Sequence, residues 1–244
     1  MNELPSVSVV VPVRNEAGNI EALVTEIEAA LSKSGAFEIV YVNDGSTDGT
    51  SGELARLSVS RPHLREILHE ASCGQSAAVR SGVRAAHGSI ILTLDGDGQN
   101  DPSFMPAFLT ALRAAGPGCG LVQGQRVGRK DTGFKRMQSR IANKVRAAVL
   151  NDGTRDTGCG FKCFPREAYL ALPYFDALHR FMPALIRREG LSIAYVDVVD
   201  RPRLTGVSNY GFFDRLWVGI VDLAGVRWLL TRRKRVPVAT EVVR

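Results

Sequence analysis

Three side chains that could supply oxygen ligands occupy alternate positions at Asp95, Asp97 and Gln99. They follow directly on the apolar run 89–94, which is typical of a buried β-strand. Mg²⁺ and Mn²⁺ prefer oxygen ligands and are usually shared between carboxylates and substrate phosphates. We therefore predict that these three residues bind Mg²⁺ or Mn²⁺ beside a phosphate-bearing ligand.

The spacing of residues excludes several other kinds of site. An EF-hand loop beginning at Asp95 would need glycine at its sixth position and glutamate at its twelfth, where Asn100 and Pro106 stand. The sequence contains no P-loop, no dinucleotide-binding glycine fingerprint and no G-x-S-x-G nucleophile elbow. His179 lies beside Arg180 at the start of a predicted helix; the alternatives are a functional role and a surface or capping role, and we expect the latter. The four histidines form no close pair with ligand spacing: His63, His69, His87 and His179.

Apolar strands alternate with helical patterns along the chain, which predicts an α/β fold with a largely parallel sheet. Ligands of such sheets bind beyond the carboxyl ends of the strands. Three predicted strands end there in polar residues, at 12–16, 43–48 and 95–99. The predicted strands are 6–13, 37–42, 64–68, 89–94, 121–125 and 192–198, and the predicted helices are 20–31, 50–60, 75–87, 134–149, 177–189 and 213–231.

The basic excess belongs to the end of the chain. The 244 residues carry 31 Lys and Arg against 25 Asp and Glu, and nine basic and three acidic residues from position 201 onward account for the whole net charge of +6. No aromatic platform is interleaved with these basic residues. A nucleic-acid or acidic-ligand binding module is therefore disfavoured, and we expect no nucleic-acid partner.

Cysteine content and hydropathy predict a cytoplasmic protein. Four cysteines in a chain of this length do not make a disulfide framework, which points to a reducing compartment. The first residues lack the positive and apolar regions of a signal peptide. No uninterrupted apolar run approaches the ~20 residues of a membrane-spanning helix, so we expect any membrane association to be peripheral, on the cytoplasmic face.

The motifs taken together resemble a known family. Three motifs resemble those of the family 2 glycosyltransferases of GT-A fold. They are Pro12-x-x-Asn15-Glu16, Asn43-Asp44-Gly45-Ser46-Thr47-Asp48-Gly49-Thr50 and Asp95-Gly96-Asp97-Gly98-Gln99-Asn100-Asp101-Pro102. Six further motifs resemble the polyprenyl-phosphate branch of this family, which includes dolichyl-phosphate mannose synthase and undecaprenyl-phosphate sugar synthases. They are Cys73-Gly74-Gln75-Ser76-Ala77-Ala78, Arg126–Asp131, Ser139-x-x-x-Asn143, Asp156-Thr157-Gly158-Cys159, His179-Arg180-Phe181-x-Pro183 and Arg201-x-Arg203-x-x-Gly206-x-Ser208-x-Tyr210. The resemblance covers residues 6–215.

This resemblance implies a Rossmann-like, largely parallel sheet flanked by helices. It also implies a metal-dependent, inverting transfer of a sugar from a GDP- or UDP-linked donor to a polyprenyl phosphate, giving a lipid-linked monosaccharide for cell-envelope modification. The alternative is a family 2 enzyme acting on a soluble, lipid A or polysaccharide acceptor. Such enzymes usually carry a late acidic residue and often a Q-x-x-R-W signature, and neither is found.

The resemblance also implies roles for individual residues. Arginine forks suit phosphate oxygens, and the predicted arginines have no acidic partner nearby in the sequence. Two residues depart from the family pattern: Asn43 replaces the first of two usual acids, and Asn209 replaces a usual lysine. The implied sets are Pro12, Asn15, Glu16, Asp44, Gln75 and Asp95 for the nucleotide sugar; Asp95, Asp97 and Gln99 for the metal; Asp97, Arg126 and Arg203 for catalysis; and Lys135, Arg136 and Ser139 for the acceptor phosphate.

The end of the chain has the pattern of an interfacial membrane helix. A helix over 213–231 places an apolar stripe with two tryptophans on one face, and the basic cluster 232–235 follows it. The alternative is a helix packed on the core. We expect a GT-A domain over 1–210, followed by an amphipathic helix and basic tail over 211–244. The stripe consists of Phe213, Trp217, Ile220, Val221, Ala224 and Trp228.

Overall fold

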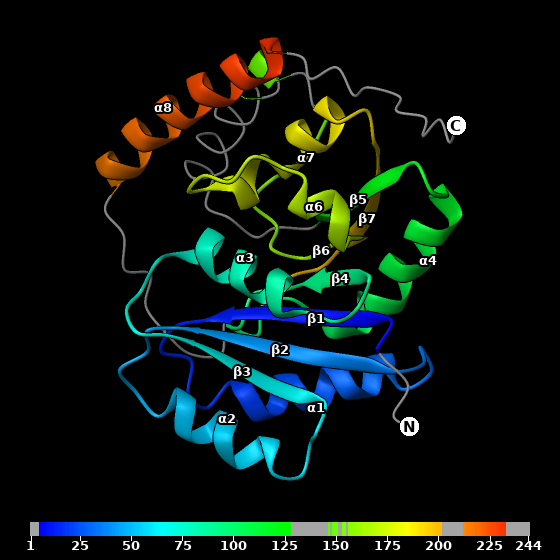
Figure 1. Cartoon of the computed structure of the whole chain (residues 1–244), viewed down its shortest axis with the longest axis vertical. Coiled ribbons are helices and arrows are strands. Elements are labelled where there is room, and N and C mark those ends of the chain that lie inside the picture. Colours follow the sequence, from blue (N-terminus) through cyan, green and yellow to red (C-terminus); the bar gives the residue numbers. More distant parts are fainter. Residues whose placement is uncertain are drawn as a thin grey trace, which may run out of the picture.

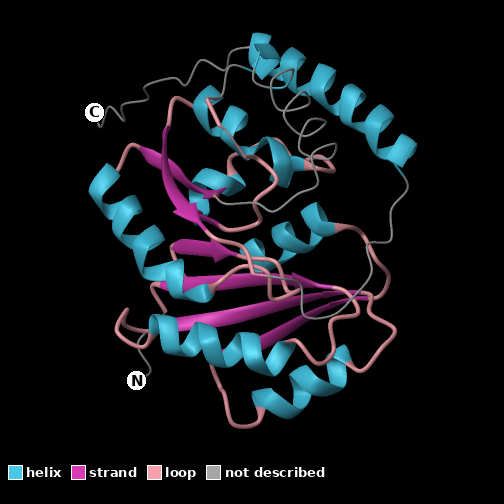
Figure 2. Cartoon of the chain, turned by 180° about the vertical axis from the view of Figure 1, so that it is seen from behind, coloured by secondary structure: helices cyan, strands magenta, loops and turns pink. Residues whose placement is uncertain are grey.

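The computed structural model describes residues 5–127, 146, 148–150, 153–154, 156–201 and 212–232, with only the backbone of 212–218. Its described strands form one sheet in the order β3-β2-β1-β4-β6-β5-β7, with helices on both faces (Figures 1 and 2). The α/β class is confirmed. The strands are β1 (Val7–Val13), β2 (Phe37–Asp44), β3 (Leu64–His69), β4 (Ile90–Thr93), β5 (Cys119–Arg126), β6 (Lys162–Pro165) and β7 (Ser192–Val198).

Two layers of helices bury the two faces of the sheet. The layer formed by α1, α2 and α4 covers one face, and the layer formed by α3, α6, α7 and α8 covers the other. A short 3₁₀ turn, η1, leads into α4. The helical elements are α1 (Ile20–Leu31), α2 (Thr50–Ser58), α3 (Gln75–Ala85), η1 (Pro102–Phe104), α4 (Met105–Ala115), α6 (Arg166–Leu170), α7 (Leu178–Arg188) and α8 (Phe212–Thr231).

Strands β3, β2, β1 and β4 are mutually parallel, so their carboxyl ends meet at one edge. The chain passes from β1 to β2 on one side and later to β4 on the other, which makes β1 the switch point where such sheets bind ligands. Among the described strands, β6 alone runs antiparallel to its neighbours, β4 and β5. The loops at 12–16, 43–48 and 95–99 therefore converge, as predicted.

Close packing positions α3 over this edge. Val10 of β1 and Val42 of β2 point toward the helix, and Gly82 faces them. A Cβ atom at Gly82 would lie 2.4 Å from Val10 Cγ1 and 2.9 Å from Val42 Cγ2. Glycine thus allows the helix to approach the sheet closely. The first turn of α3 is held at the ligand-binding edge as a result.

The buried side-chain amide of Asn43 makes hydrogen bonds at the end of β2. Its Nδ2 donates to Glu66 Oε1 at 2.9 Å and to Ser51 Oγ at 2.7 Å, while its Oδ1 accepts from the Ser46 amide at 3.0 Å. An aspartate at this position could not donate to the Glu66 carboxylate. Asparagine at position 43 is therefore matched to the glutamate on β3 in this chain.

We predict that Asn43→Asp destabilises the fold by about 2–4 kcal/mol at neutral pH, because it places two carboxylates together in a partly buried site. Chemical denaturation followed by circular dichroism measures the change. The loss should shrink as the pH is lowered, since a proton shared by the two carboxyls removes their repulsion. The double variant Asn43→Asp/Glu66→Gln restores a donor–acceptor pair and should recover most of the stability; an equally unstable double variant would contradict the explanation.

Candidate active site

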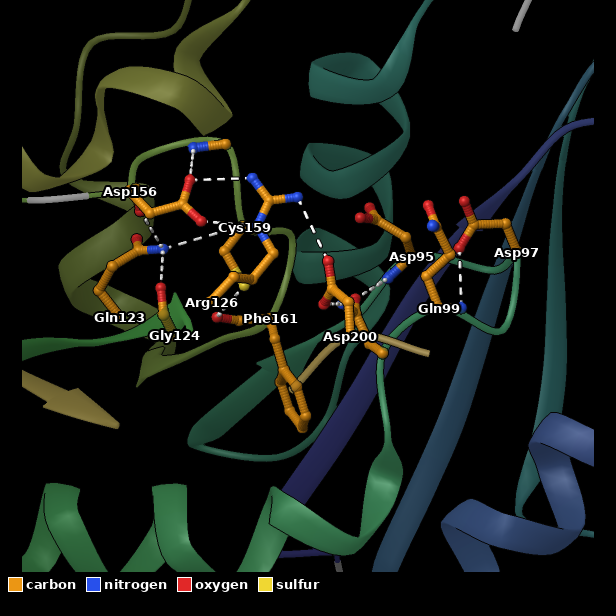
Figure 3. A network of polar contacts seen from close by, with 12 residues as sticks. Asp95, Asp97, Gln99, Gln123, Gly124, Arg126, Asp156, Cys159, Phe161 and Asp200 are labelled. Atoms are coloured by element: carbon orange, nitrogen blue, oxygen red, sulfur yellow. Dashed lines mark hydrogen bonds and ion pairs between the residues drawn. The ribbon is translucent and has the colours of Figure 1, made fainter. Parts of the chain in front are cut away.

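Acidic residues from separate parts of the chain gather at the carboxyl edge of the sheet. Asp95 and Asp97 follow β4, Asp156 precedes β6, and Asp200 follows β7. Figure 3 shows Asp200 lying between the Asp95–Asp97 loop and the guanidinium of Arg126. The sheet topology thus brings together charges that are up to 105 positions apart in the sequence.

Asp95 is held in one orientation by its surroundings. Its backbone amide donates to Asn100 Oδ1 at 2.9 Å, which closes the loop that follows β4. Its Oδ1 accepts from Nε2 of Gln75, at the start of α3, at 2.8 Å. Gln75, which is predicted to bind the nucleotide sugar, is therefore hydrogen-bonded to Asp95, which is predicted to bind the metal.

The electrostatics around Asp95 favour a bound cation. Burial, together with the charge of Asp97, raises the pKa of Asp95 to about 6, although Lys162 and Arg126 oppose the rise. Asp200 adds to the negative charge nearby. A divalent ion would offset this crowded negative charge, and oxygen donors are the ligands it prefers. The donor set therefore fits Mg²⁺ or Mn²⁺.

The loop after β4 has a conformation that presents its side chains together. Asp97 is buried, and its Oδ1 accepts from the Gln99 amide at 3.1 Å. Gly98 adopts a positive φ of 74°, which glycine allows without strain. A Cβ atom at Gly96 would lie 2.2 Å from Val13 Cγ1, so this glycine lets the loop pack on β1. Figure 3 shows Asp95, Asp97 and Gln99 side by side, as predicted from their spacing.

The segment before β6 lies directly against Asp95. Thr93 Oγ1 donates to the Gly160 carbonyl at 2.8 Å. A Cβ atom at Gly160 would lie 2.4 Å from each carboxylate oxygen of Asp95. Sequence reasoning did not identify Gly160, because its contact with Asp95 crosses 65 positions of the chain. The two glycines at 158 and 160 are the feature of the sequence that could have drawn attention to this segment, although they do not reveal its contact with Asp95.

Lys162 is a second residue that the sequence did not identify. It is buried on β6, and its ammonium group donates to the Cys159 carbonyl. Burial lowers the pKa of Lys162, although the carboxylates of Asp95 and Asp156 oppose this effect. Lys162 is thus close enough to Asp95 to affect its electrostatics.

Arg126 is held by carboxylates that are distant in the sequence. Its Nε and Nη2 donate to the two oxygens of Asp156 at 2.6 and 2.9 Å, and its Nη1 lies 3.4 Å from Asp200 Oδ2. Burial lowers the pKa of Arg126, but the bonds and charge of Asp156 outweigh it and raise the value overall. The guanidinium is therefore fixed beside the acidic cluster. Its contact with a phosphate stays a prediction.

The loops after β1 and β2 are joined by hydrogen bonds. Asn15 has a positive φ of 57°, and its Oδ1 accepts from the Thr47 amide at 2.8 Å. The Glu16 amide donates to Thr50 Oγ1 at 3.2 Å. Pro12, Asn15 and Glu16 thus lie at the same edge as the acidic cluster, although no described contact tests their predicted role in nucleotide binding.

His179 has a different environment from the surface or capping role that we expected. Its Nδ1 lies 2.7 Å from Ser76 Oγ, which joins the start of α7 to the start of α3. Burial lowers its pKa to about 3, and Lys162 and Arg180 act in the same direction. The imidazole is therefore neutral at physiological pH and connects two helices.

Four predicted residues, Lys135, Arg136, Ser139 and Arg203, lie outside the described part of the chain. The neighbouring Arg201 is described. Its amide donates to the Gln99 carbonyl at 2.8 Å, and its guanidinium contacts Asp101 at 2.7 Å. The first residue of the motif that begins at Arg201 thus contacts the loop after β4, which is predicted to bind the metal. The roles of the four residues in binding phosphate stay predictions.

Residues 8–172 match the family model described as glycosyl transferase family 2. The chain belongs to this family. A dodecaprenyl-phosphate galacturonate synthase of Rhizobium johnstonii is 33% identical over 93% of this chain and 68% of its own length. An undecaprenyl-phosphate 4-deoxy-4-formamido-L-arabinose transferase of Pectobacterium carotovorum is 30% identical over 87% of this chain and 64% of its own length. The chain thus spans about two thirds of the length of these family 2 relatives.

Solved structures confirm the GT-A fold of this family 2 chain. Glucosyl-3-phosphoglycerate synthase of Mycobacterium tuberculosis, crystallised with Mn²⁺, UDP and glucosyl-3-phosphoglycerate, superposes with a TM-score of 0.68. The two sequences are 21% identical, and the match covers 94% of this chain and 80% of that chain. Identity this low supports the shared fold alone.

We predict that Gly160→Ala weakens Mn²⁺ binding at least tenfold with little loss of stability. The added methyl group meets the side-chain oxygens of Asp95 rather than backbone, so the carboxylate must turn away from its present position. Calorimetric Mn²⁺ titration and thermal melting measure the two effects. Gly118→Ala is the matched control, because a Cβ atom there meets nothing within 4 Å. Unchanged Mn²⁺ affinity in Gly160→Ala would contradict the assignment of Asp95 as a ligand.

Proposed function

We propose that the protein transfers a sugar from a nucleotide-sugar donor to a polyprenyl phosphate, with inversion, in a reaction that depends on Mg²⁺ or Mn²⁺. The observation that carries the proposal is the desolvated Asp95–Asp97 cluster at the carboxyl edge of the sheet. Both family 2 relatives described above are named for polyprenyl-phosphate substrates or products. The glucosyl-3-phosphoglycerate synthase of the same fold was crystallised with UDP and Mn²⁺.

In this proposal Asp95, Asp97 and Gln99 hold the metal ion. The bound ion would supply charge that offsets the negative charge developing on the departing nucleoside diphosphate. Gln75 and Gly160 keep the Asp95 carboxylate in place through the contacts described above. Pro12, Asn15 and Glu16 would contact the nucleotide sugar.

The attacking group explains why a strong protein base is unnecessary. A phosphate monoester is already largely anionic at neutral pH, because its second pKa is about 6. The protein therefore has to position the lipid phosphate and stabilise charge rather than remove a proton. Lys135, Arg136, Ser139 and Arg203 are proposed to bind that phosphate, with Arg126 beside the diphosphate.

The test is a donor screen with purified protein, undecaprenyl or dolichyl phosphate, and either Mg²⁺ or Mn²⁺. One GDP- or UDP-linked sugar should label the lipid, and Asp97→Asn should lower the rate at least about 100-fold, because it removes charge at the metal site. Glu167→Gln, which changes an exposed acid on α6, is the matched control. Full turnover by Asp97→Asn in chelator, or transfer to a soluble acceptor alone, would contradict the proposal.

Helix α8 has two apolar faces with different environments. Leu223, Val226 and Leu230 pack toward α7 in the core. Ile220, Val221 and Trp228 are 50%, 54% and 58% exposed. One face therefore packs on the core, as the second alternative predicted, while membrane binding by the exposed face stays a prediction. Figure 1 shows α8 along the outside of the molecule beside α7.

We propose that the exposed face of α8 binds the membrane surface that carries the lipid acceptor. Trp228 lies beneath the guanidinium of Arg232, at 5.6 Å from ring centroid to Cζ, and Arg227 is also exposed. Tryptophan and basic residues together are typical of helices that lie in a membrane interface. Among the described residues, no helix is both long enough and apolar enough to cross a bilayer. The predicted stripe residues Phe213 and Trp217 have no described side chains.

We predict that Ile220→Ser/Trp228→Ser weakens sedimentation with anionic liposomes and leaves the melting temperature unchanged. The substituted side chains are exposed, so they contribute to lipid contact rather than to the core. Raising the salt concentration should release the parent protein, because surface attraction is screened over about 8–10 Å at physiological ionic strength. Val59→Ser, at an exposed apolar residue beyond α2, is the control. A parent protein that does not bind liposomes would contradict this part of the proposal.

A further inference from the structure

Three residues with different metal-binding side chains meet at the end of β2. Asp44 is the last residue of β2, His69 is the last residue of β3, and Cys73 lies in the loop that leads to α3. The carboxylate, imidazole and thiol each offer one ligand atom, and these atoms lie within 4.8 Å of one another. Asp44 and His69 are paired in the parallel register of β2 and β3. The sheet thus brings together residues that lie up to 29 positions apart in the sequence.

The separations of these atoms are close to those around a tetrahedral metal ion. Bonds of about 2.0–2.3 Å to Zn²⁺ place neighbouring ligand atoms about 3.3–3.7 Å apart. His69 Nδ1 lies 2.7 Å from Asp44 Oδ1, so these two atoms would separate by about 0.6 Å around the ion. The Cys73 sulfur would approach them by no more than about 1.3 Å. Cys73 is exposed, so its side chain has room for this movement.

The imidazole of His69 is oriented as a metal-binding histidine usually is. Its Nδ1 points at the Asp44 carboxylate, and its Nε2 lies 2.9 Å from Ser81 Oγ on α3. A histidine that binds a metal through one ring nitrogen usually donates its other N–H group to an oxygen, which fixes the ring. With the ion between Nδ1 and the carboxylate, Nε2 would carry the ring hydrogen and donate it to Ser81. The structure therefore contains this supporting contact.

The loop before α3 is held against Asp44. The carboxylate accepts from the Cys73 amide at 2.8 Å, from Ser72 Oγ at 2.7 Å and from the Gly74 amide at 2.9 Å. Burial opposes ionisation of Asp44, but its hydrogen bonds outweigh burial and hold its pKa below the usual value. Gly45 packs on the same loop, since a Cβ atom there would lie 2.6 Å from the Ser72 nitrogen. Cys73 is therefore kept beside an ionised carboxylate, which is the form that binds metals.

The thiol determines which metals this cluster would bind. Thiolate and imidazole ligands suit Zn²⁺, whereas Mg²⁺ and Mn²⁺ prefer oxygen. The predicted ligands Asp95, Asp97 and Gln99 offer side-chain oxygens, so the two places differ in chemistry. Cys73 is also the exposed cysteine of the chain, while the other three are buried. A thiolate-binding ion can therefore reach Cys73 from solvent.

We propose that Asp44, His69 and Cys73 form a site for Zn²⁺, or for another divalent ion that accepts a thiolate ligand, and that an ion bound there excludes the nucleotide sugar. The family resemblance implies that Asp44 belongs to the nucleotide-sugar pocket, so the ion and the nucleotide would compete for this carboxylate. The exclusion rests on the proposed function and adds a means of inhibition to it. The metal site itself stands on the geometry alone.

Titration of the full chain with Co²⁺ tests the metal site directly, because a thiolate bound to Co²⁺ gives a charge-transfer band in the near ultraviolet and oxygen ligands do not. The reduced parent protein should show this band, and Zn²⁺ should displace the Co²⁺. Cys73→Ser should lose the band, whereas Asp97→Asn, which changes the oxygen cluster, should keep it. Ser81→Ala should keep the band but bind Zn²⁺ about tenfold more weakly, because it removes the support of the histidine ring. His69→Gln should bind Zn²⁺ more weakly still.

Calorimetric binding of UDP and GDP with Mg²⁺ tests the exclusion. One equivalent of Zn²⁺ should weaken binding of the preferred nucleotide at least tenfold in the parent and leave it unchanged in Cys73→Ser, which keeps any Zn²⁺ effect at the oxygen cluster. A parent without the Co²⁺ band, or equal Zn²⁺ affinity in the parent, Ser81→Ala and His69→Gln, would overturn the site. The band with nucleotide binding unaffected by Zn²⁺ would overturn the exclusion. A parent that shows the band but binds neither nucleotide would overturn the proposed function and leave the metal site standing.

Discussion

Holding the partly buried Asp95 beside other carboxylates is the constraint on which the architecture of the site depends. An ionised group removed from water is costly unless charge or hydrogen bonds compensate it. Here Lys162 and Arg126 supply positive charge, and Gln75 supplies a hydrogen bond. Each comes from a different element: β6, β5 and the start of α3. Residues on β5 and β6 therefore neutralise a carboxylate that follows β4, and a residue at the start of α3 orients it.

This arrangement of the site explains which of its residues could be predicted from the sequence. Asp95, Asp97 and Gln99 were identifiable because they are consecutive alternate residues after a buried strand, so their proximity needs no knowledge of the fold. Gly160 and Lys162 lie near Asp95 only because β6 pairs with β4, and no local sequence pattern predicts such proximity. Likewise, the bidentate partner of Arg126 lies 30 residues away, so the arginine looked unpaired in the sequence.

The prediction of secondary structure shows the same limit. Long strands buried on both faces, such as β1 and β2, were predicted because they are continuous apolar runs. Strand β6 was not predicted, since Lys162–Pro165 has four residues and begins with a buried lysine. For α8, helical spacing identified an apolar stripe, and the structure shows that a second apolar face carries the packing on α7.

The place of β6 in the sheet has a consequence for the newly made chain. β4 pairs with β1 on one side and with β6 on the other, and about seventy residues separate β4 from β6 in the sequence. During synthesis the first half emerges with β4 as an unpaired edge, which is a template for association with other chains. The four residues of β6 close that edge and deliver Lys162 to Asp95 in the same event. Protection against aggregation and completion of the acidic cluster are thus one step of folding.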